Sequence, residues 1–153
     1  MQQVLEIGSP APAAEFIRDG GDQCSLLDFK GKKVVLYFYP KADTSGCTRE
    51  AQDFTCLEGE FAKVDALVIG LSKDPISAHN KFRDKYDLKV ILGSDSTDIC
   101  ERYGVWVEKS MYGRKYMGIE RATFLIDENG IITHIWRNVK VPNHAAEVLA
   151  RLK

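Results

Sequence analysis

The stretch VVLYFYPKADTSGCTREAQDF, residues 34–54, joins a continuous β-branched and aromatic run to a proline, a polar loop and a cysteine. A run of this kind, here residues 34–39, is typical of a strand that is buried on both faces. Pro40 ends the strand, because proline has no N–H to donate to a neighbouring strand. From Cys47 to about Val64 the apolar residues recur at every third or fourth position, which predicts a helix with one apolar face. The cysteine is therefore expected at the start of a helix that follows a buried strand.

The next part of the chain alternates between strand and helix patterns. Further strands are predicted at residues 66–72 and 89–95, and helices at residues 74–87 and 96–104. Alternating β and α units favour parallel strands, because each helix carries the chain back to the same edge of the sheet. The core of the sheet is therefore predicted to be parallel.

Two hairpins and a terminal helix complete the predicted elements. Turns at DGGD and DENG indicate hairpins within residues 13–29 and 121–138, and residues 143–153 have an amphipathic helical pattern. The apolar residues of 105–120 recur at no regular spacing, and we expect this stretch to form a long connection packed over the sheet. The sequence thus predicts an α/β protein with a thioredoxin-like fold, in which helices flank a mixed central sheet with an N-terminal β-hairpin extension.

The composition excludes several classes of partner. The chain has 153 residues and no low-complexity linker, so we predict a single domain over residues 1–153. Its formal net charge of −1 gives no bulk attraction for nucleic acid. No stretch resembles a signal peptide or a membrane span, so we expect a cytoplasmic protein without a membrane partner.

The four cysteines and three histidines show no metal-binding spacing. No CxxC pair is present, so we expect neither a metal nor another cofactor. In a reducing cytosol the cysteines are predicted to be thiols, and any disulfide is predicted to be transient. His79 and His144 are expected to lie on the surfaces of their helices.

Cys47 stands where an open α/β sheet usually places its chemistry, at the carboxyl end of a parallel strand. Asp43, Thr44 or Ser45 is a suitable helix cap, so Cys47 falls in or beside the first turn. The unpaired N–H groups and the dipole of a helix start favour an anion such as a thiolate. Taken alone, however, a cysteine in this position is more often a small buried hydrophobe than a reactive group.

The surrounding residues favour the reactive interpretation. Residues 40–50 read PKADTSGCTRE, with proline, threonine and cysteine at P-x-x-x-T-x-x-C spacing. This motif resembles the active-site signature of the peroxiredoxins. With YGVWVEKSMYGRKYMGIERATFLID (103–127), GSPAPAAEF (8–16) and RNVKVPNHAAEVL (137–149), the chain resembles the bacterioferritin comigratory protein, or Q-type, branch over nearly its whole length.

The resemblance implies a thioredoxin-dependent thiol peroxidase with antioxidant and redox-homeostasis roles. Cys47 would be the peroxidatic nucleophile, which attacks hydrogen peroxide or an alkyl hydroperoxide and becomes a sulfenic acid. Thr44 and Arg121 would donate hydrogen bonds to the sulfur or the peroxide, and Pro40 would shield the thiolate. Glu50 would orient an arginine, although a solvated glutamate is an equal alternative. Without the motif, Arg121 would be read as a surface arginine and Pro40 as a strand terminator.

The residue that would resolve the sulfenic acid is the point where the sequence departs from the branch. Many members have a second cysteine five residues after the peroxidatic one, where this chain has Gln52. Another variant has it on the next helix, here about residues 75–86, and that segment also lacks cysteine. Both usual positions are therefore empty.

Three other cysteines are candidates for the resolving role. Cys56 is nine residues beyond Cys47 on the predicted helix, about 13 Å along its axis and on the opposite face. Cys100 lies in an apolar helical context, and nothing brings Cys24 near the site. We therefore favour a one-cysteine cycle with an external reductant such as thioredoxin, glutaredoxin or a small thiol, and an internal disulfide stays as the alternative.

Other cysteine chemistries lack their partner residues. A disulfide oxidoreductase would need CxxC, and a cysteine phosphatase would need an arginine six residues after Cys47, where Asp53 stands. A papain-like protease would need a histidine signature that is missing. The non-enzymatic alternative is a thioredoxin-fold redox sensor or binding protein that reacts once. We expect a monomer.

Overall fold

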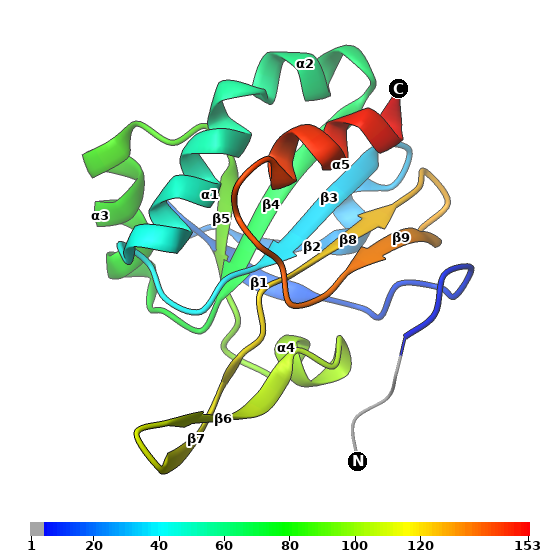
Figure 1. Cartoon of the computed structure of the whole chain (residues 1–153). Coiled ribbons are helices and arrows are strands. Elements are labelled where there is room, and N and C mark those ends of the chain that lie inside the picture. The colour runs from blue at the N-terminus through cyan, green and yellow to red at the C-terminus, as the bar shows by residue number, and fades with distance from the viewer. Residues whose placement is uncertain (1–4) are drawn as a thin grey trace.

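A seven-stranded mixed sheet forms the centre of the structure, a computed structural model that describes residues 5–153 (Figure 1). Strands β3, β4 and β5 are parallel, and each of the other neighbours in the sheet is antiparallel. The predicted mixed sheet and its N-terminal hairpin, β1–β2, are confirmed. In spatial order the strands are β2 (Gln23–Ser25), β1 (Glu15–Arg18), β5 (Ile91–Ser94), β4 (Ala66–Ser72), β3 (Lys33–Phe38), β8 (Ala122–Ile126) and β9 (Ile132–Trp136).

Helices cover both faces of this sheet. One face packs against α1 (Ser45–Cys56), α2 (Glu58–Lys63), α3 (Ile76–Tyr86) and α5 (His144–Leu152). The other face packs against α4 (Ile99–Arg102) and against the 3-10 turn η1 (Leu26–Phe29). In the part of the chain that the structure describes, no helix is long and apolar enough to cross a bilayer.

The central strand β3 divides its side chains between two apolar cores. Val35 and Tyr37 face the core under α1 and α5, whereas Val34 and Leu36 face the core on the other side. Successive side chains of a strand point to opposite faces, so a strand between two helical layers must be apolar at every position. This explains the uninterrupted apolar run in the sequence.

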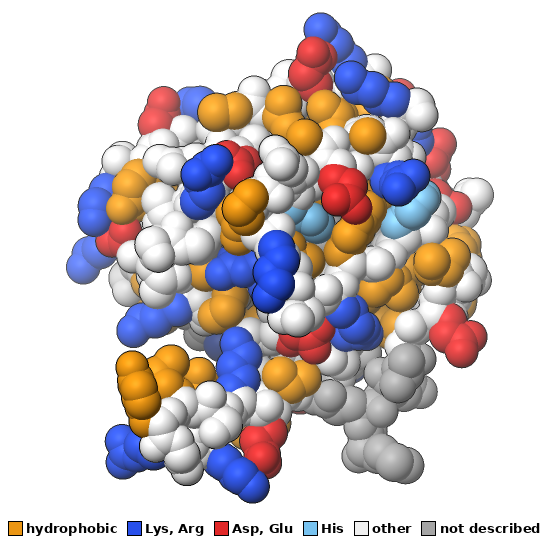
Figure 2. Space-filling model, in the orientation of Figure 1, with side chains coloured by type: hydrophobic (Ala, Val, Ile, Leu, Met, Phe, Trp, Pro, Cys, Tyr) orange, Lys and Arg blue, Asp and Glu red, His pale blue; other side chains and the backbone are white. Residues whose placement is uncertain are grey.

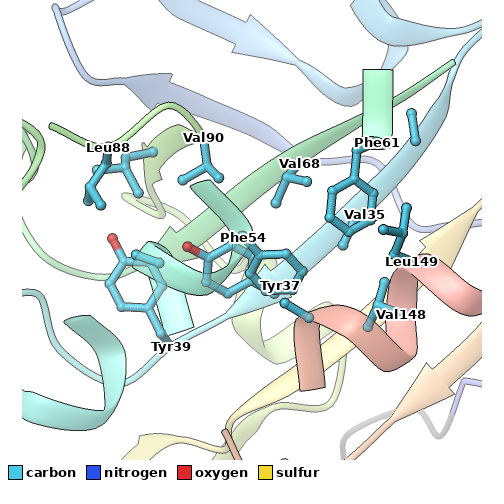
Figure 3. Close-up of a cluster of buried hydrophobic side chains, with 14 of the residues drawn as sticks. Val35, Tyr37, Tyr39, Phe54, Phe61, Val68, Leu88, Val90, Val148 and Leu149 are labelled. Carbon is cyan, nitrogen blue, oxygen red and sulfur yellow. The ribbon is translucent and has the colours of Figure 1, made fainter. Parts of the chain in front are cut away.

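Aromatic rings fix the first helix to this strand (Figure 3). The Tyr37 ring stacks on Phe54 of α1 with centroids 4.8 Å apart, and Phe54 contacts Phe61 of α2 at 5.9 Å. All three side chains are almost completely buried. Because large buried aromatic side chains dominate core energetics, this contact fixes α1, and with it the helix start, against β3.

The helix predicted from residue 47 to about 64 is instead two helices. The chain leaves helical geometry at Leu57, whose N–H donates to the carbonyl oxygen of Phe54, three residues back. A three-residue hydrogen bond tightens the last turn of a helix. The apolar spacing continues across the break, which is why periodicity alone did not reveal it.

Residues 105–120, which were expected to form a long connection packed over the sheet, instead form a separate hairpin, so that prediction is wrong. Strands β6 (Trp106–Met111) and β7 (Arg114–Ile119) pair with one another and project from the body, at the lower left of Figure 1. The turn residues Tyr112 and Gly113 both have positive φ, 52° and 80°, as in the tight turns that favour hairpins. Most of the hairpin is exposed on both faces, so its residues show no apolar alternation.

The two helical histidines are buried, contrary to the prediction that they lie on the surface. Nδ1 of His79 is 2.8 Å from Oη of Tyr39, and Nε2 of His144 is 2.8 Å from Oγ1 of Thr123. Burial lowers the pKa of His79 and lowers the pKa of His144 to about 4. Both side chains therefore act as neutral hydrogen-bonding groups within the core.

Candidate active site

Cys47 is the third residue of α1, immediately beyond the loop that leaves β3. Its side chain is only 1% exposed. Thr44 is the N-cap residue of the helix, so Cys47 lies in the first turn as predicted. The first amides of a helix have no acceptor within it, and the dipole there favours negative charge. A thiolate at Cys47 would receive both effects.

Arg121 reaches Cys47 because of the antiparallel pairing of β8 with β3. In that register Ala122 lies opposite Phe38, which sets Arg121 beside the end of β3. Nη2 of Arg121 lies 3.3 Å from Sγ of Cys47. The side chain of Arg121 is 17% exposed, so it is not the surface arginine that the sequence also allowed.

Glu50 holds the other end of the same guanidinium. Its Oε1 accepts from Nη1 of Arg121 at 2.7 Å, and the side chain is 1% exposed, so it is not solvated. Burial raises the pKa of Glu50 to about 7, and the charge of Arg121 offsets only part of that rise. Cys47 and Glu50, three residues apart in α1, thus contact two nitrogens of one rigid, planar group.

Gly46 is a residue of this arrangement that the sequence interpretation missed. A Cβ atom at position 46 would stand 3.1 Å from Nη2 of Arg121. This is tighter than ordinary van der Waals contact, so a side chain here would press on the guanidinium. The glycine just before the cysteine was the available signal, because glycine allows close approach.

The loop between β3 and α1 is attached to α3 and to the end of β4. The backbone N–H of Ala42 donates to Oδ2 of Asp74 at 2.7 Å. Asp43 accepts from Nζ of Lys85 at 2.9 Å and from Oη of Tyr86 at 2.6 Å. The loop conformation, which includes a left-handed backbone at Asp43 with φ of 62°, is therefore fixed by neighbours outside the loop.

Thr44 and Pro40 lie in this loop with exposed side chains. The hydroxyl of Thr44 donates to the carbonyl oxygen of Lys41 at 2.8 Å and makes no capping hydrogen bond to the helix. The structure thus places Thr44 next to the helix start but directs its proton into the loop. Pro40 shares a surface hollow with Arg121.

The other three cysteines are distributed around the fold. Cys56 is exposed at the far end of α1. Cys100 is buried in the apolar core on the opposite face of the sheet, where burial and Asp95 raise its pKa strongly. Cys24 is half-buried in the edge strand β2. All four cysteines are free thiols in the structure.

Comparison with known proteins identifies the family to which this arrangement belongs. Residues 7–135 match the AhpC/TSA family. The chain belongs to that family. Among curated relatives it is 50% identical to the putative peroxiredoxin bcp of Coxiella burnetii over 149 residues, which are 97% of this chain and 99% of that protein.

Solved structures give the same assignment. A variant of PrxQ from Xylella fastidiosa superposes with a TM-score of 0.92 and 37% identity, covering 98% of this chain and 96% of that one. The bacterioferritin comigratory protein of Xanthomonas campestris superposes with a TM-score of 0.86 and 41% identity, covering 91% and 89%. This chain is thus a peroxiredoxin of the Bcp and PrxQ type, a thiol peroxidase with the thioredoxin-like fold.

Proposed function

We propose that Cys47 is the peroxidatic residue of this peroxiredoxin and that its oxidised form is reduced by an external thiol. The observation that carries the first part is the 3.3 Å contact between Nη2 of Arg121 and Sγ of Cys47 at the start of α1. A cation and a helix start that converge on one buried sulfur favour its ionised form. The thiolate is the form of cysteine that acts as a nucleophile.

The proposed first step converts the thiolate and a hydroperoxide into a sulfenic acid and an alcohol, or water. The sulfur of Cys47 attacks the terminal peroxide oxygen, a new S–O bond forms, and the O–O bond breaks. The proton of the hydroperoxide is transferred to the leaving oxygen, which gives the alcohol or water and leaves a sulfenate on Cys47. One proton from solvent then converts the sulfenate into the sulfenic acid. Negative charge moves from sulfur to that oxygen, and the guanidinium of Arg121 stabilises the charge there.

Glu50 and Pro40 have supporting roles in this proposal. Glu50 fixes the rotation of the Arg121 guanidinium, because a planar fork held at Nη1 has its Nη2 directed at the sulfur. Pro40 keeps water from one side of the thiolate. Thr44 is proposed to turn its hydroxyl from the Lys41 carbonyl towards a bound peroxide oxygen, because a hydroxyl rotates readily.

Hydrogen peroxide and alkyl hydroperoxides are the proposed substrates. The structural study of the Xanthomonas campestris relative concerns its alkyl peroxide reduction activity. In the present chain, Arg121 contacts the sulfur of Cys47, and in the proposed step it acts on the peroxide oxygens, so this role does not depend on the group at the other end of the peroxide. This supports a range of hydroperoxides.

The positions of the other thiols support a one-cysteine cycle. Within the unbroken helix α1, Cys56 stands nine residues after Cys47, about 13 Å along the axis. A disulfide requires Cα atoms within about 7 Å of one another. Cys100 lies across the sheet, and Cys24 is four strands away from β3, roughly 19 Å at the usual strand spacing. An internal disulfide through any of them would require a large rearrangement.

A single oxidation experiment tests this proposal. The reduced protein is treated with one equivalent of hydrogen peroxide, then with dimedone, and each cysteine is mapped by mass spectrometry. We expect one dimedone adduct on Cys47 and no intramolecular disulfide. A stoichiometric disulfide between Cys47 and Cys56, Cys24 or Cys100 would contradict the one-cysteine cycle, and an adduct on another cysteine alone would contradict the assignment of Cys47.

A further inference from the structure

A hollow of about 460 Å³ opens on the outer side of Arg121, between the body of the molecule and the projecting hairpin β6–β7. Pro40 and Arg121 line it from the active site, and Val107 and Lys109 line it from β6. In Figure 2 the hairpin forms a lobe at the lower left that carries hydrophobic and basic side chains. Since Arg121 lines the hollow and also contacts Cys47, the hollow adjoins the reactive group.

Lys109 provides this hollow with a second cation. Its Nζ donates one hydrogen bond, to the carbonyl oxygen of Ile119 at 2.5 Å, and among residues 5–153 no carboxylate lies within ion-pair distance of it. An ammonium group has three donors, so two stay available for a ligand. Burial and then the charge of Arg121 lower the pKa of Lys109, as expected for two cations beside one hollow.

The charge of the hollow changes when Cys47 is oxidised. Glu120 contributes one carboxylate to the lining, and it accepts a hydrogen bond from the backbone N–H of Asn138. While Cys47 is a thiolate, it balances part of the charge on Arg121. A neutral sulfenic acid removes that negative charge, so the surroundings of Arg121 and Lys109 become more positive by one charge, with Glu50 and Glu120 as the remaining carboxylates. An anionic ligand is therefore bound more favourably after oxidation than before it.

The burial of Cys47 restricts the size of a reductant that attacks the folded site. A thiol must bring its sulfur into bonding contact with Cys47, which is 1% exposed and lies within the first helical turn. A protein thiol carries a large surface around its sulfur, whereas a small thiol can enter a hollow of this volume. The lining also includes the apolar side chains of Val107 and Val139, the neutral Asn138 and the acidic Glu120, so Arg121 and Lys109 are the groups that attract an anionic ligand.

We propose that this hollow binds a low-molecular-weight thiol that carries a carboxylate, with Lys109 as the residue that holds that carboxylate. The inference rests on the one-cysteine cycle proposed above. The thiolate of the bound molecule attacks the sulfur of the Cys47 sulfenic acid, an S–S bond forms, and the S–O bond breaks to release hydroxide, which becomes water. A second molecule of the thiol then attacks the mixed disulfide, which restores the Cys47 thiolate and releases the oxidised thiol as its disulfide.

The test compares small thiols that differ in charge. The protein is oxidised with one equivalent of hydrogen peroxide, and the rate of sulfenic acid loss is measured with 3-mercaptopropionate, 2-mercaptoethanol and cysteamine. The measured quantity is the ratio of the rate constant for the carboxylate thiol to that for the neutral thiol, since a general effect on Cys47 cancels in the ratio. We expect Lys109→Gln to lower this ratio by about fivefold, the size of one partly exposed ion pair, and Lys109→Arg to restore it.

Lys115→Gln is the matched control. Lys115 is on the same hairpin, and its side chain is 74% exposed. Lys109 pairs with Tyr116 across the hairpin, and successive side chains of a strand alternate between faces, so Lys115 points to the face opposite to that of Lys109. We expect it to leave the ratio unchanged. An unchanged ratio in Lys109→Gln, or an equal loss in Lys115→Gln, would overturn the inference. If thioredoxin reduces the wild-type sulfenic acid and none of the three small thiols does, the inference fails but the one-cysteine cycle stands. An internal disulfide would instead overturn the one-cysteine cycle itself.

Discussion

Nη2 of Arg121 lies 3.3 Å from Sγ of Cys47, although the two residues are 74 positions apart in the chain. The contact joins the first turn of α1 to the strand β8 through the register of Ala122 with Phe38. It combines the positive end of a helix with a permanent cation at one buried thiol. The chemistry of the site therefore depends on a long-range strand pairing as well as on the local motif.

Arg121→Lys should slow the oxidation of Cys47 by about 100-fold, the usual effect of removing one fixed donor from a developing charge. Lysine keeps the charge but lacks the planar fork that contacts Cys47 and Glu50 together. The rate constant is measured by competition with a reference peroxidase for hydrogen peroxide. Arg49→Lys is the control, because Arg49 lies on α1, the helix that carries Cys47, and its side chain is 65% exposed. This variant should react like the wild type. Equal rates in the two variants would contradict the role of Arg121.

Glu50→Gln should remove a pH dependence from the stability of the protein. Burial raises the pKa of Glu50 from 4.5 to about 7, so its protonated form is favoured in the folded state. Glu50 therefore stabilises the fold fully below pH 4.5, and this contribution is lost as the pH rises through 7. Both proteins carry Cys47→Ser, so that the reactive thiol is absent, and are unfolded with urea at pH 5 and pH 7.5. The stability of the Gln variant relative to its parent should increase between these pH values; a constant difference would contradict the assignment.

His144→Gln should have the opposite pH signature. The pKa of His144 is lowered from 6.5 to about 4, so the fold favours the neutral ring. The neutral ring stabilises the wild type above pH 6.5, and this contribution is lost as the pH falls towards 4, with each pKa unit worth about 1.4 kcal/mol. Urea unfolding at pH 7 and pH 4.5 should show the variant less stable than the wild type at pH 7 and the gap narrower at pH 4.5. A gap that widens in acid would contradict the buried neutral histidine.

The strand that precedes Cys47 and the helix that carries it were predictable because their signals are local. The apolar run that predicts the strand, and the apolar residues at every third or fourth position that predict the helix, can each be recognised within a short stretch of sequence. The hairpin β6–β7 was not predictable in this way: Met111, Tyr112, Tyr116 and Met117 are exposed, so no buried face imposes alternation on its sequence.

The site was predictable only in part, because it also depends on contacts between residues that are far apart in the sequence. Arg121 was assigned from a family motif, because strand register cannot be read from composition. The burial of His79 had an overlooked signal, its position three residues before Phe82 on the same helical face. His144 likewise lies four residues before the buried Val148.

Gly70→Ala should destabilise the fold by about 1–3 kcal/mol, the usual cost of overpacking a core. A Cβ atom at Gly70 in β4 would stand 2.6 Å from the Tyr37 ring, the same ring that stacks on Phe54. Gly59→Ala is the matched control, because a Cβ atom at that position in α2 meets nothing within 4 Å. The control should be stabilised by about 0.5–1 kcal/mol, since alanine favours a helix over glycine. Urea unfolding at pH 7 measures both, and equal effects would contradict the close packing at Tyr37.

The most direct test of the central claim is the steady-state consumption of hydrogen peroxide by Cys47→Ser and Cys56→Ser, with dithiothreitol as reductant. Cys56 is the exposed thiol at the other end of α1, so its replacement disturbs no buried contact. We predict that Cys47→Ser abolishes turnover and that Cys56→Ser keeps at least half of the wild-type rate. Full peroxidase activity in the Cys47→Ser protein would contradict the account.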